Sequence, residues 1–403
     1  MGRRGEKSSR LFLWPVAALV GTGETAYACF SFSSSDTLYE WSRRGIMHDL
    51  VTAVLSFVLP LCVTLFVLPR FAHIATELGL VDLPNQRKVH QSPKPLVGGL
   101  AMSLGVAFGC LLLVPLSMVK GGSLRGYYGA SMLLVLIGFF DDFREVNHRL
   151  KFAAQIIAAL LLGYFSSVSL TSFGDLLDFG PIVFPAWGPL MTVLGTVGVI
   201  NAINMIDGVD GLAGGVSLVA FSSFSLLSYV DGHRTLLLVC LALCGAIIAF
   251  LRYNWHPSKL FMGDAGSLFL GLSASFVSIA ITQEDHSLVR PVAPLLVLAV
   301  PIADTLTVMT RRVMKGKSPF YPDKTHLHHV LLKFGFTKRQ TASIIIALSA
   351  AFSLLAIAGT LFDIPEYYLF AVFLVYFFTC FAFSFFAKRV ILSRRTCRRE
   401  AKA

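Results

Sequence analysis

The feature of this sequence that most constrains its fold is a succession of apolar runs, each about as long as a membrane is thick. About eleven such runs follow one another from residue 51 onward, each near the roughly 20 residues that a helix needs to cross a bilayer. Inside lipid a spanning segment must pair its own backbone groups, as a helix does. The sequence therefore predicts an all-α polytopic integral membrane protein. We place the spans near residues 51–69, 96–119, 126–140, 150–170, 189–206, 211–230, 235–251, 265–282, 290–309, 341–361 and 366–387.

The composition supports this fold class and divides the chain into three parts. Of the 403 residues 55% are hydrophobic and only 14% are charged, which is far too apolar for a soluble globule. Residues 1–50 form an N-terminal extension that resembles a signal-like region or an extra helix. Residues 51–387 form one membrane-embedded domain, and residues 388–403 form a basic tail that we expect to anchor to anionic lipid. Residues 171–187 alternate turn and apolar residues, which predicts a small extracytoplasmic β-hairpin.

The distribution of basic residues predicts the orientation. The loops on one side of the eleven spans carry 24 Lys and Arg residues, whereas those on the other side carry four. By the positive-inside rule, the first set is cytoplasmic. The net charge of +11 therefore reflects membrane topology, and no nucleic-acid-binding motif accompanies it. The seven cysteines lie mostly inside apolar runs without metal-site spacing.

Amides and carboxylates end the predicted span 189–206. Asn201, Asn204 and Asp207 lie three residues apart on one side of a helix, and Asp210 follows between glycines. Their oxygens are hard ligands of the kind that Mg²⁺ prefers, and through the metal they could hold a phosphate. The alternative is an ordinary helix end capped by Asn and Asp.

Two further acidic clusters lie on the same side of the membrane. Asp141 and Asp142 repel each other unless a cation or a proton-transfer role relieves the repulsion, although a solvated helix end would also explain them. They point about 100° apart on a helix and should have different roles. Asp264 lies between two glycines before a new span, where an anionic ligand would need an intervening metal. Phe261 could stack on a base, or it could be an ordinary apolar residue at a span edge.

Two basic loops complete the polar clusters. Residues 80–100 are rich in Pro and Gly and carry basic side chains. These side chains could attract a phosphate, or they could only reflect the cytoplasmic location of the loop. The loop after residue 310 contains three histidines, His326, His328 and His329, which could bind zinc. Because Arg311 and Arg312 would repel a metal and attract phosphates, we favour binding of a diphosphate.

All these clusters lie at span ends on one membrane face. This arrangement suits Mg²⁺-assisted phosphoryl transfer between a soluble nucleotide and a lipid that stays in the bilayer. A transporter or lipid flippase would instead place its ionisable groups in the middle of the spans. A purely structural scaffold would leave the clustered charges without a purpose.

Four ordered motifs resemble the polyprenyl-phosphate N-acetylhexosamine-1-phosphate transferase family (glycosyltransferase family 4). They are Asp141-Asp142, Asn201-x-x-Asn204-x-x-Asp207-Gly-x-Asp210-Gly211, Phe261-Met-Gly-Asp264-Ala-Gly-Ser267 and His326-Leu-His328-His329. Residues 81–90 and 318–323 are similar to the bacterial UDP-N-acetylglucosamine (UDP-GlcNAc) branch. The peptidoglycan-precursor branch has three consecutive histidines where Leu327 intervenes here.

The resemblance implies a reaction and a set of site residues. Undecaprenyl phosphate would attack the β-phosphate of UDP-GlcNAc and release UMP, with Mg²⁺, or Mn²⁺ as a substitute, held by Asn204 and Asp264. Asp141, Asp142 and Asp207 would be the catalytic carboxylates. The substrate-binding residues would be Lys151, Asn201, Asp210, Asn254, Phe261, Arg312, His326, His328 and His329.

The resemblance also implies a setting. The protein would lie in the bacterial inner membrane with its site facing the cytoplasm, and it would start a cell-envelope glycan such as O-antigen or teichoic acid. Another UDP-sugar, such as the phospho-MurNAc-pentapeptide, stays open as the donor, and so does a homodimeric state.

Overall fold

A computed structural model describes residues 35–82, 93–113, 124–284, 287–318 and 325–400, with side chains described between residues 49 and 386. The chain forms two compact units, Met1–Met47 and His48–Ala403, and the site lies in the second. The helices are α1 Ser35–Leu78, α2 Gly98–Leu113, α3 Leu124–Phe143, α4 His148–Ser166, α5 Gly188–Ile206, α6 Leu212–Val230, α7 Arg234–Asn254, α8 Gly263–Thr282, α9 Val292–Val297, α10 Ala299–Val313, α11 Leu327–Phe334, α12 Lys338–Leu361 and α13 Glu366–Glu400, and a short 3-10 turn (η1) covers Pro185–Trp187.

Every predicted span overlaps a helix, and the chain is a multi-pass membrane protein. Within the described residues eight helices are long and apolar enough to cross a bilayer, fewer than the predicted eleven. The run at 96–119 contains the 16 residues of α2, and its residues 114–119 lie outside the described part of the chain. The run at 290–309 is split into α9 and α10, which meet at Leu298. Helix α13 continues through most of the predicted basic tail, to Glu400.

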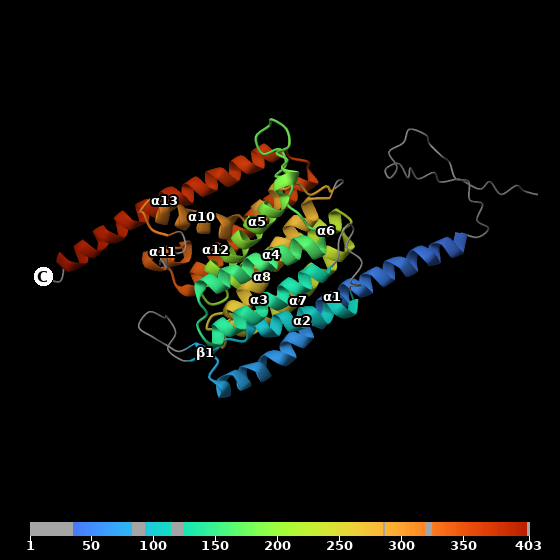
Figure 1. Cartoon of the computed structure of the whole chain (residues 1–403), viewed down its shortest axis with the longest axis horizontal. Coiled ribbons are helices and arrows are strands. Elements are labelled where there is room, and N and C mark those ends of the chain that lie inside the picture. The colour runs from blue at the N-terminus through green and yellow to red at the C-terminus, as the bar shows by residue number, and fades with distance from the viewer. Residues whose placement is uncertain (1–34, 83–92, 114–123, 285–286, 319–324, 401–403) are drawn as a thin grey trace, which may run out of the picture. The chain divides into compact units, whose positions relative to one another are not determined.

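Helix α8 lies at the centre of the bundle (Figure 1). In its most apolar window 89% of the residues are buried, against 17% for the windows of α1 and α13. It packs on α2, α3 and α5, which come from different parts of the chain. The residue at its beginning therefore reaches side chains from several other helices.

Glycines allow the close packing around α8. A Cβ atom at Gly138 of α3 would overlap the backbone of Ala265, and one at Gly99 of α2 would overlap the backbone of Gly266. Where α8 packs on α5, a Cβ atom at Gly271 of α8 would overlap the backbone of Ile200. Such backbone-to-backbone approach is how membrane helices pack without a hydrophobic driving force.

The only regular strands in the described residues are short and lie beside α8. Strand β1 (Val81–Asp82) pairs antiparallel with β2 (Lys94–Pro95), and Leu96 then pairs in parallel with Phe261. The backbone of the first predicted basic loop is thus joined to the segment that precedes α8. The basic residues Arg87, Lys88 and His90 of this loop lie outside the described residues.

The predicted hairpin at 171–187 folds back as expected but makes no regular strands. Its backbone bonds join Phe173 N to Ile182 O at 3.0 Å and Phe184 N to Thr171 O at 2.8 Å, around one isolated bridge. Positive φ angles at three turn residues, Gly174, Asp178 and Gly180, interrupt the extended backbone.

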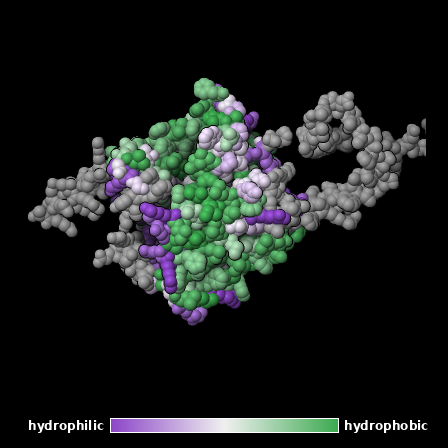
Figure 2. Space-filling view, viewed as in Figure 1, coloured by the Kyte–Doolittle hydropathy of each residue, from purple (hydrophilic) through white to green (hydrophobic). Residues whose placement is uncertain are grey.

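The described surface agrees with a lipid environment. Figure 2 shows apolar residues over most of one face, with hydrophilic residues gathered toward its left edge. Large apolar side chains are exposed on several helices, among them Met132 on α3, Leu160 on α4 and Leu194 on α5. Lipid chains can cover such side chains, which water would not tolerate over so wide a patch.

The contact between α3 and α8 gives a test of this packing. We expect Gly138→Ala to lower the unfolding midpoint in detergent, because the added methyl group must separate two backbones, at a cost of about 1–3 kcal/mol. Gly129→Ala on the same helix is the control, since nothing lies within 4 Å of its Cβ position. Thermal unfolding of the two purified variants is the measurement, and equal midpoints would contradict the proposed packing.

Candidate active site

The centre of the candidate site is the first turn of α8. Asp264 accepts a hydrogen bond from Asn204 Nδ2 at 2.8 Å and forms an ion pair with Lys151. The same amide nitrogen of Asn204 donates to Ser267 Oγ at 2.7 Å. Three helices, α4, α5 and α8, therefore contribute side chains to one cluster of charged and amide groups.

Lys151 links the two acidic motifs. Its ammonium lies 3.1 Å from Asp141 Oδ2 and also contacts the carboxylate of Asp264. Asp141 uses its other oxygen to accept the N–H of Val146 at 2.8 Å, which shapes the turn between α3 and α4. Asn147 then caps α4 by accepting the N–H of Arg149 at 2.9 Å. The cluster thus depends on a well-defined turn between two helices.

Asp142 has different partners from its neighbour Asp141. Its two oxygens accept the backbone N–H groups of Asp264, at 2.8 Å, and Ala265, at 3.2 Å, so it caps the N-terminus of α8. Gly263 has φ +73°, and a Cβ atom at this position would overlap the carboxylate of Asp142, so a side chain would not fit. Burial raises the pKa of Asp142 to about 7, and the charge of Asp141 adds to the effect.

The turn after α5 carries two carboxylates in different surroundings. Asp207 has surface open to solvent, yet the surrounding protein and the charges of Asp142 and Asp210 raise its pKa to about 7. Asp210 is buried and bonded to His256 Nδ1 at 3.0 Å, with Lys338 Nζ at 3.9 Å. Burial alone would raise the pKa of Asp210, but these partners together hold it below its ordinary value. Asp207 is thus the more accessible of the two.

Asn254 connects two loops of the site. It is buried, its Oδ1 accepts the N–H of Gly211 at 2.9 Å, and its Nδ2 donates to Leu260 O at 2.9 Å. Both ends of the amide are therefore used by the protein's own backbone. Asn254 therefore helps to position the two loops, and the substrate contact that the resemblance implies stays a prediction.

Phe261 is half-buried at the edge of the cluster. The ammonium of Lys94 lies 4.8 Å from the centre of its ring and donates to Ser258 Oγ at 2.6 Å. Burial lowers the pKa of Lys94, while the charge of Asp210 opposes that shift. A uracil base stacked on Phe261, as the resemblance implies, would share the ring with this cation.

The histidine motif lies against the turn after α5. His326 Nδ1 is 2.9 Å from Asp304 Oδ2, and the other oxygen of Asp304 accepts the N–H of Leu327 at 2.8 Å. His328 is buried with its ring against Gly208, where any side chain would collide with Nε2. Burial, together with His329, lowers the pKa of His328 to about 3, so its imidazole is neutral at physiological pH.

Two other predicted substrate residues lie within the helix bundle. Arg312 is buried in the last turn of α10. The amide of Asn201 donates to Gln155 Oε1 at 2.7 Å and to Val197 O at 2.8 Å, so it links α5 to α4. The side-chain nitrogen of Asn201 is therefore already used in hydrogen bonds to α4 and to its own helix.

The structure adds polar residues that the motifs did not indicate. Asp304 accepts a hydrogen bond from the backbone beside His326 and contacts its ring, and His256 binds Asp210. Asp304 could have been found, because a carboxylate within a predicted span is uncommon and usually functional. Nothing in the spacing of the sequence pairs His256 with Asp210, 46 residues away.

Comparison with known proteins shows the family of this chain. Residues 124–282, from α3 to the end of α8, match glycosyl transferase family 4. An undecaprenyl-phosphate α-N-acetylglucosaminyl 1-phosphate transferase of Yersinia pestis is 36% identical over 75% of this chain and 84% of its own length. The protein with the same name in Escherichia coli K12 is 35% identical over 76% of this chain and 83% of its own length. A probable undecaprenyl-phosphate N-acetylglucosaminyl 1-phosphate transferase of Bacillus subtilis is 34% identical over 76% and 85%. The chain therefore belongs to glycosyl transferase family 4.

Proposed function

We propose that this protein transfers N-acetylglucosamine 1-phosphate from UDP-GlcNAc to undecaprenyl phosphate. An oxygen of the lipid phosphate forms a bond to the β-phosphorus of the nucleotide sugar, and the bond from that phosphorus to the bridging oxygen breaks, so that UMP leaves. The names of the relatives support this reaction. The observation that carries it is the cluster of Asp141, Lys151, Asn204 and Asp264 at helix ends, where a soluble nucleotide and a membrane lipid can meet.

The donor set fits magnesium. Asp141 and Asp264 offer carboxylates, and Asn204 offers an amide oxygen, all hard ligands. Among the described residues, no three or more His, Cys, Asp or Glu side chains lie close enough to hold a metal by themselves. Mg²⁺ needs fewer protein ligands, because it keeps waters and binds substrate phosphates as well. When bound, the ion would neutralise phosphate charge and polarise the diphosphate.

The protein's own groups contribute positive charge and fixed positions. A lipid phosphate is largely ionised near neutral pH, so the main obstacle is repulsion between two anions rather than generation of the nucleophile. Lys151 supplies a cation next to Asp141 and keeps Asp264 in place. His328, being neutral, can exchange hydrogen bonds with the substrate but adds no charge.

We further propose that the protein lies in the bacterial inner membrane and that its site faces the cytoplasm. The acidic and histidine motifs all fall in or beside the loops that carry most Lys and Arg residues, and cytoplasmic loops have this bias. UDP-sugars are water-soluble, so a site at helix ends on this side would have access to them. The product would then be the first lipid-linked intermediate of a cell-envelope glycan.

The donor sugar is the first thing to test. Purified protein with undecaprenyl phosphate and Mg²⁺ should release UMP with UDP-GlcNAc and much less with UDP-N-acetylgalactosamine or UDP-MurNAc-pentapeptide. UMP is measured by a coupled assay. Equal or faster release with the pentapeptide donor would place the protein in the peptidoglycan-precursor branch. No release with any donor, from protein that is folded, would favour a transporter or flippase.

The second test concerns Asp264. The change Asp264→Asn keeps the shape but removes the charge, and we expect UMP release to fall at least about 100-fold, as for loss of one preorganised electrostatic contact. Asp178→Asn is the matched control, since Asp178 lies in the 171–187 loop with φ +59°, a conformation that Asn also tolerates. Both variants should insert and purify like the wild type. Full activity of Asp264→Asn would remove this carboxylate from the mechanism.

The third test concerns the metal. Excess EDTA should abolish UMP release, and added Mg²⁺ or Mn²⁺ should restore it, because the protein ligands alone cannot replace the missing positive charge. A parallel unfolding measurement in EDTA shows whether the protein stays folded. Turnover that continues at the full rate in EDTA would contradict the magnesium assignment.

A further inference from the structure

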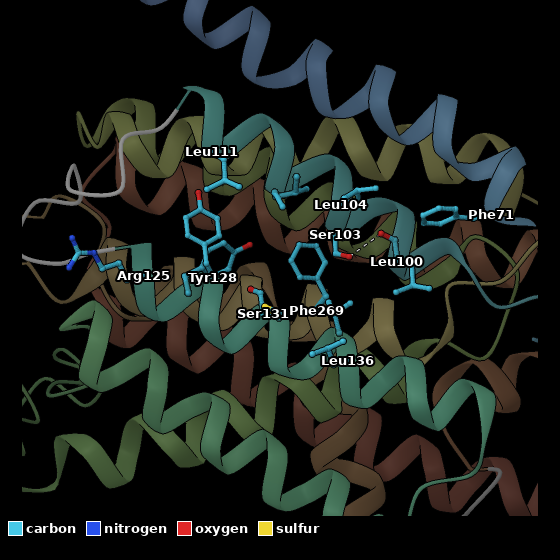
Figure 3. Close-up of a pocket in the computed structure, with 15 residues that line it drawn as sticks. Phe71, Leu100, Ser103, Leu104, Leu111, Arg125, Tyr128, Ser131, Leu136 and Phe269 are labelled. Atoms are coloured by element: carbon cyan, nitrogen blue, oxygen red, sulfur yellow. Dashed lines mark hydrogen bonds between the residues drawn. The ribbon is translucent and has the colours of Figure 1, made fainter. Parts of the chain in front are cut away.

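A pocket of about 670 Å³ lies between α2 and α3, away from the carboxylate cluster (Figure 3). The two helices touch each other little because each packs mainly on other helices, α3 on α4 and α8, and α2 on α7 and α8. Phe269 of α8 lies in the floor of the gap and Phe71 of α1 lies at one end. The described part of the lining is almost wholly apolar.

The polarity of the lining changes in one direction along α3. Arg125 lies at one end, Tyr128 and Ser131 follow, and Met132 and Leu136 are apolar. Residues three, four and seven apart lie on the same face of a helix, so these side chains face the gap together. The lining therefore passes from a cation through hydroxyl groups to hydrocarbon.

Two of these hydroxyl groups lie near other polar groups without making a regular hydrogen bond to them. Tyr128 Oη and Ser131 Oγ are both buried, and neither makes a hydrogen bond of normal geometry to a described residue. They lie near the Cys110 thiol and the Tyr127 hydroxyl, respectively. Buried polar groups normally have partners, so two such groups in one pocket point to a ligand that has oxygen atoms at this level.

We propose that the groove between α2 and α3 binds a glycerophospholipid with an anionic headgroup. The phosphate lies at Arg125, the ester oxygens lie near Tyr128 and Ser131, and one acyl chain follows the apolar lining. From Leu100 to Leu111 the groove extends about 16 Å along α2. One leaflet of a bilayer contributes about 15 Å of hydrocarbon, so the groove accommodates the chain of a lipid from one leaflet.

This site is separate from the proposed lipid acceptor site. Asp141 lies 16 residues beyond Arg125 on the same helix, which is about 24 Å along its axis. A phosphate held at Arg125 therefore cannot reach the cluster around Asp264. The bound phospholipid instead fills the space between α2 and α3 and stabilises the two helices that flank the beginning of α8.

Native mass spectrometry of the whole protein in detergent, with added phosphatidylglycerol or phosphatidylcholine, tests the proposal. Phosphatidylglycerol should bind preferentially, and Arg125→Gln should weaken its binding roughly fivefold, as expected for one Arg near a membrane surface. Ala107→Trp fills the groove and should abolish binding. Ala153→Trp, on the exposed face of α4, is the matched control and should bind normally.

Three results would overturn the proposal. The first is equal binding of both lipids with no effect of Arg125→Gln, which would remove the headgroup assignment. The second is unchanged binding to Ala107→Trp, which would place the lipid elsewhere on the surface. The third is displacement of phosphatidylglycerol by undecaprenyl phosphate, which would assign the groove to the polyprenyl chain. Because Arg125→Gln alters an exposed side chain, it remains informative even where Ala107→Trp fails to fold.

Discussion

The rest of this structure depends on the cap that α3 provides for α8. Asp142 accepts the N–H groups of Asp264 and Ala265, and Gly138 lets the two helices approach closely enough for this to happen. A helix N-terminus in a mostly apolar molecule needs such partners, because its free N–H groups have little water to bind. The cap also determines where the carboxylate of Asp264 points, and therefore where Lys151 and the substrate phosphates can be held.

Four acidic residues of the site divide into two kinds according to their partners. Asp142 and Asp210 are used by the protein itself, the first at a helix end and the second with His256 and Lys338. Asp141 and Asp264 share the one ammonium of Lys151, and their cluster is the part suited to a divalent ion. Close carboxylates are tolerated here because hydrogen bonds and cations offset their repulsion.

Much of this arrangement could be predicted from the sequence, and the reasons for the exceptions are physical. Apolar runs located the helices because lipid allows few alternatives, and the polar interruptions located the motifs at their ends. The break at Leu298 and the burial of Asn254 depend on tertiary packing, which leaves no local signal. The pairing of Asp304 with His326 joins an apolar run to a loop 22 residues later, and residue spacing alone does not show it. The structure places the predicted residues, but their catalytic and binding roles stay predictions.

The contact between Gly208 and His328 restricts how this part of the chain can vary over evolutionary time. A larger residue at position 208 has room only where the imidazole at 328 is replaced by something smaller or turned aside. Although the two positions are 120 residues apart, we expect substitutions at one to be accompanied by substitutions at the other, because the two residues are in contact. A natural chain with a bulky residue at the first and an intact ring at the second would require a differently shaped turn after α5.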